Sequence, residues 1–236
     1  MRIYIRYLFL LPLLLTTACT DLQPEASNPE ARLNQERRAY RADLKTDLDA
    51  FHQELQAFEA QWQEAGEETQ VGLQETRNGL RVQYDKLRQD LERLDGSDAS
   101  VFDRQRNALT QRLYDLEINL KAARLEVIEP RMAFEEAAEA RLDEMDRNLA
   151  ALTQHVQGAP QTPTAVSDDV LAELQQQHDE VARQLEHLAG ASEDTFRDLR
   201  TEMARAVARL DTEISRAMDH MARALGTPEP KDETAS

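Results

Sequence analysis

The sequence predicts an all-α fold, an elongated antiparallel bundle of three long helices with coiled-coil character. Apolar residues recur at steps of eleven positions over most of the chain. Eleven residues make three turns at about 3.67 residues per turn, close to the 3.6 of an α-helix. Glycine and proline are scarce, at 7 and 8 of 236 residues, and 31% of the residues are charged. That composition is typical of long helices, and no stretch shows the alternation typical of a strand.

The first helix is predicted over residues 29–94. Its start is marked by three signals: Asn28 as the cap, Pro29 in the first turn, and Glu30 as an acid at the positive end of the helix dipole. An aromatic row at helical spacing is typical of a core rather than of a ligand-stacking ladder. The row in this helix consists of Tyr40, Phe51, Trp62, Leu73 and Tyr84.

The second helix is predicted over residues 99–156. Pro130 lies in its middle and removes one backbone hydrogen bond, so a kink is expected there. Tyr114, Ile118 and Ile128 flank the apolar stripe, and they either complete the bundle core or face a partner. The stripe itself consists of Phe102, Leu109, Leu113, Leu116, Leu120 and Val127, followed by Phe134, Leu142, Met145, Leu149, Leu152 and Val156.

A loop rich in glycine and proline is predicted over residues 157–166, and the third helix over 167–225. Ser167 is expected to cap the first turn of this helix, where two aspartates follow it. The helix carries the clearest rows of the chain, with mostly charged or small residues between them. The rows are Leu174, Leu185, Phe196, Val207 and Met218; Leu188, Leu199, Leu210 and Met221; and Val170, Val181, Ser192, Met203, Ile214 and Leu225.

The lengths of the three segments predict how they pack. Each has about sixty residues, or about 90 Å of helix, and short connections fold neighbouring helices back antiparallel. Residue i of the first helix then faces about residue 194 − i of the second, and residue i of the second faces about residue 324 − i of the third. On this register Gly66, Pro130 and Gly190 lie at one height, one weak position in each helix. We therefore expect the rod to bend or hinge at that level.

The first 18 residues have the features of an export signal, not of structure. Arg2 and Arg6 precede an apolar run that is too short to span a bilayer, and the segment ends in small residues before Cys19. This ending resembles the lipobox of bacterial lipoproteins. The resemblance implies cleavage between Ala18 and Cys19, lipidation of the Cys19 sulfur, and acylation of the new N-terminus by a chain such as palmitate.

The lipoprotein resemblance also implies an address. Thr20 follows the cysteine, which in the Gram-negative sorting pattern indicates the periplasmic face of the outer membrane and disfavours retention at the inner membrane. Cys19 is the only cysteine in the chain, so it has no intramolecular disulfide partner. Residues 19–28 are expected to form a tether, 29–226 one coiled-coil domain, and 227–236 a disordered tail.

Composition excludes several function classes. The net charge is −17, and removing Arg2 and Arg6 with the signal takes it to −19. Nucleic acid is therefore not expected as a partner, because phosphate binding needs clustered Lys and Arg. The usual catalytic and metal-ligand motifs are absent, and none of the five histidines has the Glu-x-x-His spacing of bundle di-metal sites. No enzyme activity, metal or cofactor is predicted.

Three functions remain open. The first is a lipid-anchored periplasmic scaffold or adaptor, whose partner is an envelope protein, the cell wall or a second copy of the chain. The second is a bundle that binds lipid or an apolar ligand, since eleven-residue amphipathic repeats are similar to those of exchangeable apolipoproteins. The third is a periplasmic holding chaperone, with a groove lined by Met132, Phe134 and Met145.

Overall fold

The computed structural model describes residues 29–94, 99–158 and 166–224. In this part of the chain every regular element is an α-helix, and the all-α class is confirmed. Ala18, Cys19, the predicted tether and the predicted tail lie outside the described residues. The helices are α1 (Pro29–Glu64), α2 (Glu67–Glu92), α3 (Ala99–Glu126), α4 (Arg131–Gly158), α5 (Asp168–Ala189) and α6 (Glu193–Ala224).

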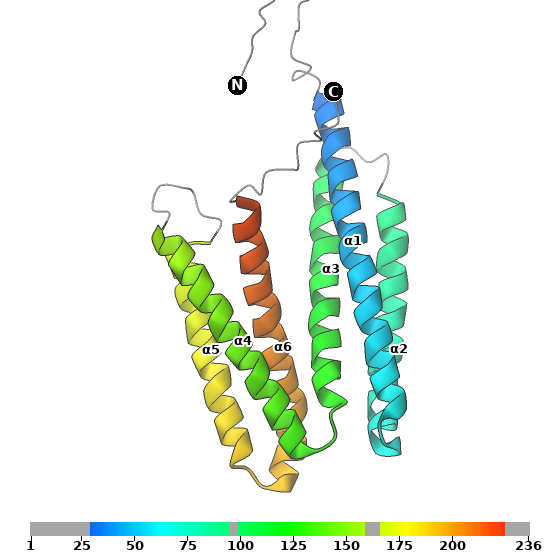
Figure 1. The fold of residues 1–236 in the computed structure, drawn as a ribbon. Coiled ribbons are helices and arrows are strands. Elements are labelled where there is room, and N and C mark those ends of the chain that lie inside the picture. Colours follow the sequence, from blue (N-terminus) through cyan, green and yellow to red (C-terminus); the bar gives the residue numbers. More distant parts are fainter. Residues whose placement is uncertain (1–28, 95–98, 159–165, 225–236) are drawn as a thin grey trace, which may run out of the picture.

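The helices lie side by side, each running opposite to the one before it in the chain (Figure 1). Three tight reversals, at 65–66, 127–130 and 190–192, lie together at one end of the molecule, which we name the turn end. Helices α1, α2 and α3 contact one another and form a first bundle, while α4, α5 and α6 form a second. Helices α3 and α6 pack together along a seam that joins the bundles.

The prediction of three helices of about sixty residues is therefore wrong, because each predicted helix is a pair of shorter ones. At Gly66, Pro130 and Gly190 the chain reverses instead of bending. An eleven-residue row shows which face of a helix is apolar, but not which other helix packs against that face. A connection of two to five residues is enough to fold an apolar stripe back onto its own continuation.

The reversal at 65–66 is held by one side chain of α2 and one from the turn at 127–130. The last carbonyls of a helix have no partner within it, and here the Gln70 side-chain amide donates to the carbonyls of Gln63 at 3.1 Å and Ala65 at 2.8 Å. The next helix begins with the Gly66 N–H, which donates to Glu129 Oε1 at 2.5 Å. The backbone groups at both ends of this turn thus have hydrogen-bond partners. The second of these contacts joins the turn to the one at 127–130.

Pro130 ends α3 because it has no N–H to donate to the carbonyl four residues earlier, that of Glu126. Arg200 of α6 supplies the missing donor. Its Nη2 donates to the Glu126 carbonyl at 2.6 Å and also to the carbonyl of Ile128. The proline that ends a helix of the first bundle thus creates a binding site for an arginine of the second.

Arg131, the first residue of α4, caps the C-terminus of α5 in the same way. Its guanidinium donates to the carbonyls of Leu188 at 3.0 Å, Ala189 at 2.7 Å and Ala191 at 2.9 Å. A cation at this place also faces the negative end of the α5 dipole. The carbonyls lie around Gly190, so one arginine holds the third reversal against the start of α4.

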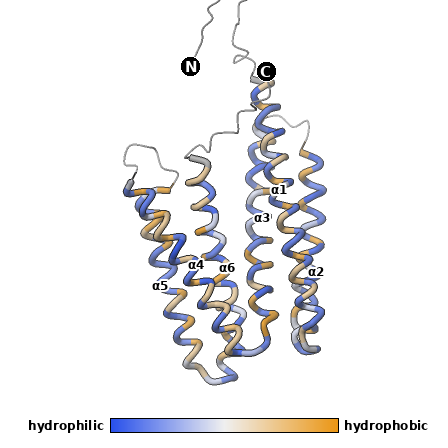
Figure 2. Tube along the Cα trace, in the orientation of Figure 1, coloured by the Kyte–Doolittle hydropathy of each residue, from blue (hydrophilic) through white to orange (hydrophobic). Residues whose placement is uncertain are grey.

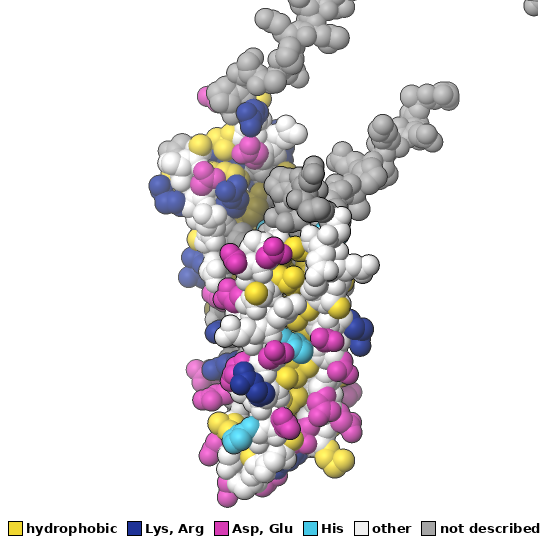
Figure 3. Space-filling model, turned by 90° about the vertical axis from the view of Figure 1, so that its left-hand side faces the viewer, with side chains coloured by type: hydrophobic (Ala, Val, Ile, Leu, Met, Phe, Trp, Pro, Cys, Tyr) yellow, Lys and Arg dark blue, Asp and Glu magenta, His cyan; other side chains and the backbone are white. Residues whose placement is uncertain are grey.

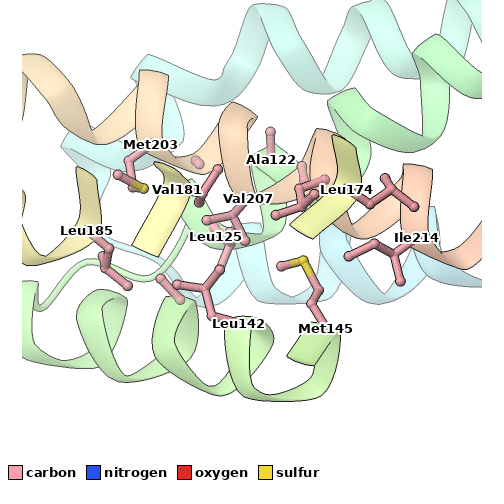
Figure 4. Close-up of a cluster of buried hydrophobic side chains, with 14 of the residues drawn as sticks. Ala122, Leu125, Leu142, Met145, Leu174, Val181, Leu185, Met203, Val207 and Ile214 are labelled. Atoms are coloured by element: carbon pink, nitrogen blue, oxygen red, sulfur yellow. The ribbon is translucent and has the colours of Figure 1, made fainter. Parts of the chain in front are cut away.

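Each bundle has its own apolar core. Hydrophobic and hydrophilic residues alternate along every helix (Figure 2). Most members of the predicted rows are buried, and Leu174, Leu185, Phe196 and Val207 are between 1% and 5% exposed, whereas Val170 is 43% exposed. Side chains of α4, α5 and α6 meet in the second core (Figure 4). Burying one such side chain contributes about 1.5–3 kcal/mol, so these rows supply most of the stability.

Capping of α6 and α5 at their N-termini follows simple sequence signals. The Ser167 hydroxyl accepts a hydrogen bond from the Val170 N–H at 3.3 Å, so the predicted cap is confirmed. Ser192 accepts from the Thr195 N–H at 3.3 Å in the same way.

Within the described residues, none of the helices combines the length and the apolar character needed to cross a membrane.

Replacing Arg131 with Ala is expected to lower the free energy of unfolding by about 2 kcal/mol, because three carbonyls lose charge-assisted hydrogen bonds. Equilibrium urea unfolding followed by circular dichroism measures this. The matched control is Arg141→Ala on the same helix, where the arginine makes an exposed pair with Glu144 at 3.1 Å. That variant is expected to change stability by less than about 0.5 kcal/mol. Equal losses in the two variants would contradict the capping role.

Candidate functional site

The apolar residues that flank the stripe of the second predicted helix lie at the seam. Ile118 and Ile128 pack against the second core. The Tyr114 hydroxyl donates to Glu213 Oε1 at 2.9 Å, and burial together with this hydrogen bond raises the pKa of Tyr114 to about 12. Of the two alternatives for these residues, the structure shows the internal one, since they join the two bundles of the same chain.

Polar contacts also cross the seam. Lys121 Nζ lies 2.8 Å from Asp211 Oδ2, with side chains 26% and 14% exposed. The Arg216 guanidinium stacks on the Tyr114 ring at 3.9 Å from the centroid, and its Nη2 donates to the Thr110 carbonyl at 3.5 Å. Ion pairs and cation–π contacts of this kind orient two surfaces but add little net stability once their desolvation is counted. The bundles are therefore positioned by polar contacts over much of their junction.

Two glutamates of α3 are partly buried at the seam. Burial raises the pKa of Glu117 against the opposing effect of Arg216 and Lys121. Burial also raises the pKa of Glu126, although it accepts a hydrogen bond from Thr201 Oγ1 at 3.2 Å. In both cases the charged form is less favourable in the folded chain than in water. Burial of each charged carboxylate therefore costs free energy in the folded chain at neutral pH.

A groove of about 370 Å³ lies beside the seam, between α1, α3 and α6. Its floor includes buried leucines such as Leu44 and Leu120. Along α1 it extends from residue 40 to residue 54, or about 21 Å at 1.5 Å per residue. The polar and charged residues that line it are Tyr40, Asp43, Asp47, Glu54, Thr110, Glu117, Lys121, Thr212, Ser215, Arg216, Asp219 and His220.

The groove is negatively charged. Five carboxylates line it against one lysine, one arginine and one histidine. Lys121 is already paired with Asp211, and Arg216 lies over Tyr114. On the opposite wall, Glu54 is paired with Arg124 at 3.2 Å. The excess negative charge comes from the three carboxylates of α1, because the lining charges of α3 cancel one another, as do those of α6.

The predicted hinge residues all lie at the turn end, where residues beside Pro130 link them. Glu129 binds the N–H of Gly66, and Arg131 binds the carbonyls around Gly190. Sequence reasoning missed these two residues, because their partners are about sixty positions away and no spacing marks them. The available signal was a charged residue on each side of a proline, next to a predicted break.

The groove expected for a holding chaperone does not form from the predicted residues. Phe134 and Met145 are fully buried in the second core, and only Met132 is on the surface, at 72% exposed. Both buried side chains belong to the eleven-residue row of α4, which explains their position.

In the described ranges, no group of three or more His, Cys, Asp or Glu residues is placed to hold a metal ion.

No protein family model, curated protein or solved structure matches this chain.

Replacing Glu117 with Gln is expected to raise the free energy of unfolding at pH 7 by up to about 1 kcal/mol, because the folded chain no longer holds a desolvated charge. The folded pKa is the higher one, so the wild-type carboxyl takes up its proton first in the folded state. The gain should therefore shrink as the pH falls through the folded pKa towards about 4.3, the value in unfolded chains.

Urea unfolding at pH 7 and pH 4 tests this expectation. Glu136→Gln is the control, since it makes the same change at an exposed position of α4. The account fails if Glu117→Gln lowers stability at pH 7, or if its advantage over the wild type grows at pH 4.

Proposed function

We propose that this chain is a lipid-anchored helical scaffold of the bacterial cell envelope, which acts through protein–protein contacts and not as an enzyme. The observation that carries the proposal is the groove between α1, α3 and α6, which is elongated and negatively charged. An elongated groove fits an extended or helical segment of another protein better than a compact substrate. The charge favours a segment that carries Lys or Arg.

The groove offers such a segment both kinds of contact that it needs. Asp43 and Asp47 lie one turn apart on α1, and Asp219 lies on α6. All three side chains are exposed. The aliphatic stem of a lysine or arginine can pack along the apolar floor while its charge pairs with a carboxylate. Two such residues one turn apart would match the aspartate pair.

The surface charge supports the same class of partner. Asp and Glu side chains gather over the lower part of the face formed by the second bundle (Figure 3), and the whole chain has a net charge of −17. A field of one sign speeds the approach of an oppositely charged partner and disfavours others. We therefore take the partner to be an envelope protein with a basic segment, and the cell wall or a second copy as alternative outcomes of the test.

The anchor in this proposal is the acylated Cys19 on the periplasmic face of the outer membrane. Stable attachment needs more than one acyl chain, which lipoprotein processing provides. Ten residues from Cys19 to Asn28 precede the start of α1 at Pro29. The first described residues lie at the end of the molecule opposite the turn end (Figure 1). The turn end would then point away from the membrane.

A photo-crosslinking amino acid at position 50, which lines the groove, is expected to capture one envelope protein in intact cells. The same group at the exposed position 83 on α2 should not capture it. Mass spectrometry identifies the product. The double charge reversal of Asp43 and Asp47 to Lys should lower capture about tenfold, because the groove loses its attraction for a cation.

Two controls separate the parts of the proposal. Reversing Glu136 and Glu139 to Lys makes the same change in net charge on exposed positions of α4, and should leave capture unchanged. Cys19→Ser should move the chain from the membrane to the soluble periplasmic fraction. Capture that is insensitive to charge reversal in the groove, or equal at positions 50 and 83, would rule out the groove as the binding surface.

A further inference from the structure

We infer that the two bundles are arms that pivot about residues 127–130, so that the groove opens and closes at the side away from the turn end, with the charge on Glu117 favouring the open form. This inference does not depend on which partner the groove binds. It rests on how the bundles are built, on the contacts at the turn between them, and on the change in the seam along its length.

The two cores are nearly independent. The first core is formed by α1, α2 and α3 with Val127, and the second by α4, α5 and α6. Helix α3 adds two buried residues, Ala122 and Leu125, to the second core, and the half-buried Ile118 also packs against it, so its apolar contacts with that core lie in the half of α3 nearer the turn at 127–130. Separating the bundles farther from this turn would leave both interiors closed. Movement there therefore exposes little apolar surface.

The turn itself is held from both sides. Ile128 packs against both cores. Glu129 binds the N–H of Gly66 in the first bundle, while Arg200 of the second bundle binds the carbonyls of Glu126 and Ile128. Apolar contact and three hydrogen bonds thus fix this end of the seam. A junction that is strong at one end and weak at the other moves by rotation about the strong end.

The other end of the seam is weak. The Arg216–Thr110 hydrogen bond is long, at 3.5 Å, and the Tyr114–Glu213 pair and the Arg216–Tyr114 ring contact lie nearer the turn. Space lies on both sides of α6 at this height, because a second groove of about 400 Å³ opens between α3, α5 and α6. Both grooves are lined by Arg216 and the exposed His220.

Glu117 lies between the turn and this weak end. It faces Arg216 of α6 and the acids Asp47 and Glu54 of α1, with Lys121 on its own helix. Closing the seam removes water from this carboxylate, and the two cations only partly offset that cost. Opening returns the charge to water. A neutral side chain of the same shape at position 117 should therefore favour the closed form.

Distances between spin labels test the pivot on the full chain with Cys19→Ser, in which the introduced cysteines are the only thiols. One pair, at exposed positions 108 on α3 and 172 on α5, spans the side away from the turn end. A second pair, at exposed positions 74 on α2 and 139 on α4, spans the turn end. The first distance distribution is expected to be at least about twice as wide as the second. Equal widths would overturn the pivot.

Glu117→Gln gives an independent readout on the first pair of labels. It should shift the population towards the shorter distance by about twofold or more, while Glu136→Gln, the same change at an exposed site, should leave the distribution unchanged. A shift towards the longer distance, or the same response in both variants, would overturn the role of Glu117. The measurement uses no partner protein, so it is separate from the test of the proposed function.

Discussion

A helix that ends inside a packed molecule must find donors for its last carbonyl groups, and this requirement shapes the whole chain. Three helices end at the turn end, and each is capped by a long polar side chain: Gln70 for α1, Arg200 for α3 and Arg131 for α5. Two of these side chains bind a reversal other than their own. The caps thus end helices and also hold the three reversals against one another.

The rest of the architecture follows from these reversals. Each long amphipathic segment folds onto itself, and the six resulting helices enclose two small cores in place of one long core. Most of the apolar surface is used within the bundles, and polar pairs such as Lys121–Asp211 and Tyr114–Glu213 cross their junction. A groove with a surplus of carboxylates forms where α1, α3 and α6 meet. The proposed function and the proposed motion both depend on this polar junction.

Much of the core could be predicted from the sequence. The eleven-residue rows identified buried residues such as Phe51 and Phe196, because a helical period marks the covered face whatever covers it. The expected register of about 324 − i agrees with the contacts of Gln175 with Thr153 and of Tyr114 with Glu213. This register survives because the reversals lie at the same height on each segment.

The path of the chain and the groove could not be predicted in the same way. Glycine or proline in an apolar stripe is compatible with a kink or with a reversal, and the difference depends on distant donors such as Arg200 and Arg131. As a result, α1 runs parallel to α3, as the Tyr40–Thr110 and Glu54–Arg124 contacts together show, where an antiparallel neighbour was expected. The groove brings together charged residues from positions 40 to 220. No local pattern distinguishes them from other solvated helix residues.

The most direct test of the account is one distance between spin labels at exposed positions 45 on α1 and 89 on α2, in the chain with Cys19→Ser. If the chain reverses at Gly66, the two positions lie side by side, and the measured distance should be below about 25 Å. A continuous or gently bent helix from 29 to 94 would place them about 66 Å apart at 1.5 Å per residue. A distance near that larger value would contradict the reversal, and with it the two bundles, the seam and the groove.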